Sequence, residues 1–159
     1  MILTSNFVIK RRNTIIEIVS ALFILLFAYT GINKLISIDT LQFVLKDYPL
    51  IGGFPNLVAW GLPVTELIVV LFLFIPRTRK IGLYCSLVLM SFFTLYLIYM
   101  LIFTPNKPCT CGGMLQQLSW TQHLIFNGAF ILLALLALRL SRLRPRDNNH
   151  VGVSRAIYT

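Results

Sequence analysis

The sequence predicts an all-α membrane protein, a bundle of four antiparallel transmembrane helices with both termini in the cytoplasm. Three observations predict this fold class. The chain is 57% hydrophobic and 12% charged, whereas a soluble domain usually carries about 25% charged residues. Four long apolar runs each approach the roughly 20 residues that cross a hydrocarbon core about 30 Å thick. The positively charged residues gather on alternate sides of these runs.

The predicted helices form one transmembrane domain, 14–138, which follows an N-terminal segment, 1–13, and precedes a basic tail, 139–159. Within this domain we expect helices at 14–36, 56–75, 81–103 and 118–138. Their only charged residues or histidines are Glu17, Lys34, Glu66 and His123. A chain of this length cannot bury four such helices in a soluble core, so lipid must solvate them.

The connections between the helices predict their order in space. The first helix follows Lys10, Arg11 and Arg12, as the apolar part of a signal peptide would. Its apolar stretch is too long for that, and no convincing cleavage site follows, so we expect it to be retained. Residues 39–45 are expected to form a short interfacial helix capped by Asp39. The short turn 76–80 makes the second and third helices antiparallel neighbours, which indicates an up-down-up-down bundle.

The distribution of positive charge predicts the topology. Eleven of the fourteen Lys and Arg residues precede the first helix, lie between the second and third, or follow the fourth. Because cytoplasmic loops are enriched in Lys and Arg, both termini and the turn 76–80 are expected in the cytoplasm of a multi-pass inner-membrane protein. The net charge of +9 could suggest nucleic acid. Its positions instead favour topology signals and phospholipid contacts, so the expected partner is the lipid bilayer and not nucleic acid.

Two of the three cysteines, Cys109 and Cys111, fall between the third and fourth helices, on the expected periplasmic side. Disulfides persist in that compartment, and a ring closed across one residue is strained and therefore easily reduced. This pattern favours thiol–disulfide exchange. A structural staple and a metal site are alternatives, but such a staple removes little chain entropy and a fourth metal ligand is not evident. Cys85 is expected to be a buried, unreactive thiol.

Polar residues within the helices predict a pocket below this loop. Glu66 falls close to the bilayer midplane, so it should face the bundle interior and be protonated or paired. Trp120, His123 and Asn127 share one face of the fourth helix. Lys34 could reach Glu66 or extend outward to lipid phosphates. The pocket expected from these positions opens to the outer side and is lined by Tyr29, Lys34, Glu66, His123 and Asn127.

Three motifs make the chain similar to a known family. They are Gly31-Ile-Asn-Lys-Leu35, Leu62-Pro-x-x-Glu66, and the Cys-x-Cys-Gly loop before the last helix. In order and spacing they resemble the MauE/DoxX-like membrane proteins over roughly residues 14–138. Gly112 departs from the common family form, in which an aromatic residue follows the second cysteine. The resemblance implies four membrane helices linked to extracytoplasmic redox chemistry, and it assigns Lys34, Glu66, Cys109 and Cys111 to family positions.

The resemblance also implies a range of functions. MauE itself is associated with maturation of methylamine dehydrogenase, whose small subunit is rich in disulfides, and other relatives are associated with quinol oxidation or sulfur metabolism. The first hypothesis is therefore a thiol–disulfide oxidoreductase that acts on a periplasmic thioredoxin-like protein or a disulfide-containing client. Its expected catalytic residues are Cys109, Cys111 and His123, and its expected residues for binding a quinone or relaying protons are Tyr29, Lys34, Glu66 and Asn127.

Two other hypotheses belong to different classes. The protein could be a non-enzymatic accessory subunit that assembles into a homo- or hetero-oligomeric membrane complex, with the cysteine pair as a structural clip. It could instead transport a small molecule or a metal, with Glu66 as an ion-coupling carboxylate. A pathway through only four helices would require oligomerisation, which places transport last.

Overall fold

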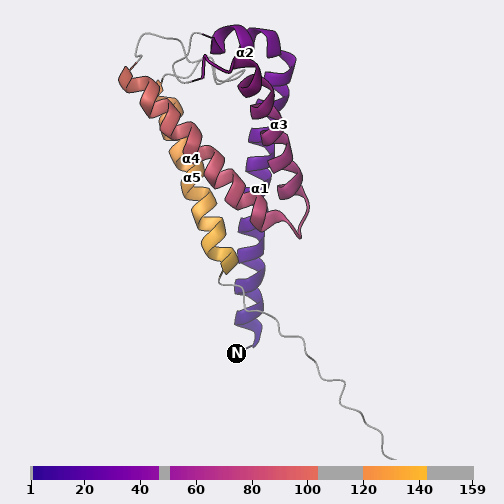
Figure 1. Cartoon of the computed structure of the whole chain (residues 1–159). Coiled ribbons are helices and arrows are strands. Elements are labelled where there is room, and N and C mark those ends of the chain that lie inside the picture. The colour runs from indigo at the N-terminus through magenta and orange to yellow at the C-terminus, as the bar shows by residue number, and fades with distance from the viewer. Residues whose placement is uncertain (1, 47–50, 104–119, 143–159) are drawn as a thin grey trace, which may run out of the picture.

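The computed structural model describes residues 2–46, 51–103 and 120–142, and these residues form five helices (Figure 1). The helices are α1 (Ile2–Ile36), α2 (Ile38–Leu45), α3 (Pro55–Phe74), α4 (Arg79–Phe103) and α5 (Trp120–Arg142). All except α2 are long and apolar enough to cross a membrane, with candidate spans Arg11–Ile36, Pro55–Phe74, Arg79–Phe103 and Thr121–Arg142. The predicted all-α architecture with four membrane-spanning helices is confirmed.

Two helix starts differ from the sequence-based expectation. Helix α1 begins at Ile2 and not near residue 14. The Lys and Arg residues there end the apolar run, but they are good helix formers and do not end the helix. Helix α2 is preceded by Ser37 as its N-cap, whereas Asp39 lies in its first turn. A carboxylate in the first turn still interacts favourably with the helix dipole, although it does not cap the helix.

The long helices pack as two pairs, α1 with α3 and α4 with α5. A short turn around Thr78 joins α3 to α4. The backbone N–H of Thr78 donates a hydrogen bond to the carbonyl oxygen of Ile75 at 3.1 Å. Helix α2 lies across one end of the bundle, toward which the two pairs diverge (Figure 1). We call this the α2 end. It holds the C-termini of α1 and α4 and the N-termini of α3 and α5.

Two separate clusters of buried apolar residues, at different positions along the bundle, hold the helices together. The larger core fills the half of the bundle away from α2, where Phe23 stacks on Phe27 and meets the edge of Phe130 at ring-centroid distances of 5.7 and 5.2 Å. A smaller core under α2 contains Leu45, Ala59 and Met100. The other buried members of the larger core are Val19, Val69, Leu73, Leu83, Met90, Ala134, Ala137 and Leu138.

The outward faces of the helices are also apolar. Leu25, Phe74, Phe103 and Ile125, one on each long helix, are each at least 65% exposed. Soluble monomers rarely expose apolar surface on this scale. The four helices are therefore solvated by the lipid bilayer, and the two cores described above are the interior of a membrane bundle.

Candidate functional site

A cavity of about 310 Å³ lies at the α2 end, where the two helix pairs diverge. Its wall is mostly aliphatic and aromatic. Five of its polar lining residues come from three helices, namely Thr30, Lys34, Glu66, His123 and Asn127. The aromatic lining residues are Phe27 on α1, Phe92, Phe93 and Tyr96 on α4, and Phe126 on α5.

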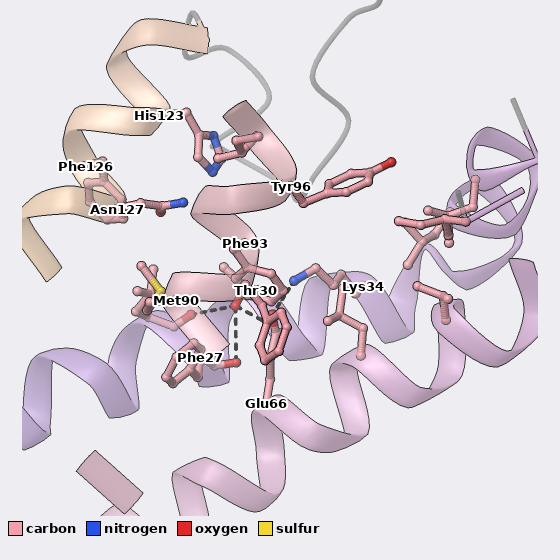
Figure 2. Close-up of a pocket in the computed structure, with 18 of the residues that line it drawn as sticks. Phe27, Thr30, Lys34, Glu66, Met90, Phe93, Tyr96, His123, Phe126 and Asn127 are labelled. Atoms are coloured by element: carbon pink, nitrogen blue, oxygen red, sulfur yellow. Dashed lines mark hydrogen bonds and ion pairs between the residues drawn. The ribbon is translucent and has the colours of Figure 1, made fainter. Parts of the chain in front are cut away.

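The centre of the site is an ion pair between α1 and α3 (Figure 2). The Nζ of Lys34 lies 2.5 Å from Oε1 of Glu66, and the two side chains are only 6% and 1% exposed. The hydroxyl of Thr30 lies 3.3 Å from Oε2 of Glu66 and donates to the carbonyl of Leu26 at 2.9 Å. The Lys34 ammonium also lies 5.5 Å from the ring centroid of Phe93, within reach of a cation–π contact. Each charge is thus compensated inside the membrane, where an unpaired charge would be costly.

Gly31 explains how α1 and α3 come close enough for this pair. A Cβ at Gly31 would lie 3.3 Å from Oε2 of Glu66 and 3.4 Å from the carbonyl oxygen of Pro63. Small residues allow such close approach of membrane helices. Lys34 lies nearly one turn beyond Gly31 on α1, and Glu66 lies nearly one turn beyond Pro63 on α3, so the two sequence motifs meet at this contact.

Helix α5 contributes the opposite wall of the cavity. His123 and Asn127 are 7% and 4% exposed, although they lie in an otherwise apolar span. Both reach from α5 into the site, across from Lys34 and Glu66 (Figure 2). Because they stand four residues apart, a single helical face presents an imidazole and an amide to the same space.

The structure brings together four of the residues that the sequence predicted for this pocket: Lys34, Glu66, His123 and Asn127. Tyr29 is 41% exposed, and it lies on a face of α1 outside the cavity lining. Cys109 and Cys111 fall outside the described residues, so the structure does not place them relative to the cavity. Cys85 packs against the larger core, but it is half-buried, whereas the sequence predicted a buried thiol.

Sequence reasoning noted Thr30 one turn from Lys34 but did not include it among the site residues, and it missed the aromatic wall. Thr30 stands one turn before Lys34, and that spacing was the available signal for a role beside the ion pair. The aromatic residues Phe27, Phe93, Tyr96 and Phe126 gave no comparable signal, because the same spans carry other aromatic residues that do not line the cavity.

The arrangement has the chemistry of a site for a flat, partly polar molecule. Pockets for small ligands are mostly apolar, with a few convergent polar groups that fix orientation. Here the aromatic wall offers stacking surface, while Lys34 and Asn127 carry N–H donors. The imidazole ring of His123 adds a further nitrogen-bearing group, which can donate or accept a hydrogen bond.

These features define a multi-pass helical membrane protein with four candidate spans and a buried polar site at one end of the bundle. The chain belongs to the family described as methylamine utilisation protein MauE, which matches residues 12–140. The family resemblance indicated by the sequence motifs is thereby confirmed, and the chain is linked to methylamine utilisation. No curated protein and no solved structure matches the chain.

Proposed function

We propose that this MauE-family protein performs thiol–disulfide exchange at the outer face of the cytoplasmic membrane, through Cys109 and Cys111, in support of the maturation of a disulfide-containing client. The observation that carries the proposal is the cavity at the α2 end, which combines a buried ion pair with an imidazole and an amide. A purely structural bundle has no need of four polar side chains converging on an open space inside the membrane.

Chain connectivity supports a link between the cysteine pair and this cavity. The pair belongs to the segment that joins the end of α4 to the start of α5. Both helix ends lie at the α2 end, and both helices line the cavity nearby, through Leu97 on α4 and His123 on α5. The excess of Lys and Arg near the opposite end supports an outward-facing α2 end.

The proposed exchange conserves electrons and protons. A thiolate of the client attacks one sulfur of the Cys109–Cys111 disulfide, which breaks that bond, forms a mixed disulfide and releases the other cysteine as a thiolate. The client's second thiolate then attacks the client sulfur of the mixed disulfide, so the client is oxidised and the pair is reduced. His123 accepts a proton that a thiol releases when the disulfide forms again. A bound quinone would supply a two-electron, two-proton acceptor for that step. The residues present fit such a group, because Lys34 and Asn127 offer hydrogen bonds to a carbonyl oxygen beside aromatic rings.

Trapping of mixed disulfides tests the proposal. In Cys109→Ser or Cys111→Ser chains, the remaining thiolate can attack the disulfide of the oxidised partner, which breaks that bond and forms a mixed disulfide. The missing cysteine can no longer resolve this mixed disulfide. One of the two variants should accumulate a reductant-sensitive adduct on non-reducing gels. Cys85→Ser is the matched control. Cys85 lies within α4, away from the loop, so this variant should form no adduct and should still support maturation.

Loss of client maturation in both loop variants, with an adduct in one, is the expected result. If neither variant captures a partner and both still support maturation, thiol exchange by this pair is wrong. The protein would then be a non-enzymatic accessory subunit, and stoichiometric copurification with a membrane complex, unaffected by reductant, would identify it as one.

A further inference from the structure

A second cavity, of about 240 Å³, lies at the end of the bundle opposite α2. It is formed where the first part of α1, the turn between α3 and α4, and the end of α5 meet (Figure 1). The apolar candidate spans also begin or end here, at Arg11, Phe74, Arg79 and Arg142. The cavity therefore lies at the depth of the lipid headgroups, and not in the hydrocarbon core.

The lining of this cavity is strongly basic. Arg12, Arg79 and Lys80 contribute three cations, against the single carboxylate of Glu17. That carboxylate is 65% exposed and lies 3.6 Å from Nη1 of Arg79, so it compensates only one of the three charges. Exposed pairs of this kind are weak, which allows Arg79 to turn toward a stronger anion.

Arg12 provides a second, independent observation. Its Nη2 donates to the carbonyl of Leu140 at 2.7 Å, a contact that holds the guanidinium between α1 and α5. Its Nε is buried and has no hydrogen-bond partner among the residues that the structure describes. A buried donor without an acceptor is costly and rare in folded proteins. Arg12 itself lines the cavity, so its positive charge stands beside the space that an anion would occupy.

We propose that this cavity binds a phosphate group, carried by the headgroup of an anionic phospholipid. The guanidinium of Arg12 presents a planar fork of donors that matches phosphate geometry, and Lys80 adds a mobile point charge. Ile16, Leu83 and Leu140 form an apolar part of the lining, suited to the first carbons of the lipid. Basic pockets between membrane helices bind anionic headgroups in this way. The proposal is independent of the redox function proposed above.

A specific binding site and a diffuse positive surface predict different effects when single cations near this cavity are substituted. Arg11 and Arg139 are exposed cations near this end of the bundle, but neither lines the cavity. Arg11 is the chain neighbour of Arg12, so Arg11→Gln removes the same charge at the same depth. If the cavity is a specific binding site, substitution of Arg12 or Lys80 should weaken lipid binding more than substitution of Arg11. General attraction to an anionic surface should make the three effects equal.

Native mass spectrometry of the full-length protein, delipidated in detergent and titrated with phosphatidylglycerol or phosphatidylcholine, tests the proposal. We expect preferential retention of phosphatidylglycerol, with affinity reduced about tenfold by Arg12→Gln or Lys80→Gln, as for the loss of one charge-assisted hydrogen bond. Arg11→Gln should change the affinity less than about twofold, in line with a screened surface charge. Lys80 is exposed, so its variant keeps the test valid if Arg12→Gln does not fold.

A second arm distinguishes the source of the phosphate. Inorganic phosphate and glycerol 3-phosphate are added at millimolar concentration as competitors. Failure to displace phosphatidylglycerol assigns the site to a lipid headgroup, as proposed, whereas full displacement assigns it to a soluble phosphate and overturns the lipid assignment. Equal losses in Arg11→Gln and Lys80→Gln, or equal retention of both lipids, would overturn the binding site itself.

Discussion

Lys34 and Glu66 form a buried ion pair that ties α1 to α3, with Nζ and Oε1 2.5 Å apart. Removing one partner leaves an uncompensated charge inside the membrane. Glu66→Leu or Lys34→Met should therefore lower the free energy of unfolding by about 3–5 kcal/mol. The double variant replaces both charges with apolar groups, so it should recover most of this loss. Thermal or denaturant unfolding of the purified wild-type protein, the two single variants and the double variant in detergent measures these free energies of unfolding.

Glu17→Gln is the control for this prediction. Glu17 also has a cationic partner, but its side chain is 65% exposed and the Arg79 nitrogen lies 3.6 Å away. The change should cost less than about 1 kcal/mol. A Lys34 and Glu66 double variant that is as unstable as the sum of the two single variants would show that the pair is not coupled.

Three glycines should differ sharply in their tolerance of a methyl group. A Cβ at Gly82 would lie 2.8 Å from the backbone nitrogen of Leu73, and one at Gly31 would lie 3.3 Å from Oε2 of Glu66. Because backbone cannot move aside as a side chain can, Gly82→Ala should be the more damaging change, and each should cost about 1–3 kcal/mol. A Cβ at Gly61 would meet nothing within 4 Å among the described residues, so Gly61→Ala should be neutral or stabilising. Unfolding midpoints in detergent check this order.

The sequence was sufficient to predict the membrane helices, because their apolar runs are long and interrupted by few charges. It could not predict where α1 begins. Lys10, Arg11 and Arg12 end the apolar run, yet nothing in their chemistry opposes a helix, and the structure continues the helix back to Ile2. Hydropathy thus locates the part of a helix that lipid covers, and not the whole helix.

The sequence also could not predict which side of α1 faces the interior of the bundle. Tyr29 and Asn33 are one turn apart, and so are Thr30 and Lys34, so helical spacing alone offers two equivalent polar faces. The structure buries Thr30 and Lys34 and leaves Tyr29 41% exposed. The choice depends on Gly31, which allows α3 to approach that side of α1. Such packing between segments distant in the chain is not encoded in the periodicity of either one.

Asn127 should affect the redox state of the cysteine pair if the cavity serves re-oxidation. Asn127→Leu keeps the approximate volume but removes the amide from the cavity wall. Loss of one hydrogen bond should slow re-oxidation of Cys109 and Cys111 about 2–10-fold. Differential alkylation of the two thiols in intact cells, after a pulse of reductant, measures this rate. Depletion of membrane quinone should produce the same delay in the wild-type chain.

Tyr29→Phe is the control for this experiment. The phenol lies on the exposed side of α1, outside the cavity lining, so its hydroxyl should make no difference to the rate. Re-oxidation that is insensitive to both Asn127→Leu and quinone depletion would exclude the cavity from the redox cycle. It would leave exchange by the cysteine pair itself open to the trapping test.

The orientation of the bundle can be measured at positions that the structure describes. Thr40 on α2 and Pro76 in the turn between α3 and α4 are both exposed and lie at opposite ends of the bundle. Substituting either with cysteine leaves every positive charge in place, so the charge distribution that predicts the topology is unchanged. The three native cysteines are first replaced by serine. An impermeant thiol reagent should then label Thr40→Cys in sealed spheroplasts and Pro76→Cys only in inverted vesicles. The reverse pattern would put the α2 end in the cytoplasm, where a disulfide between Cys109 and Cys111 would not persist.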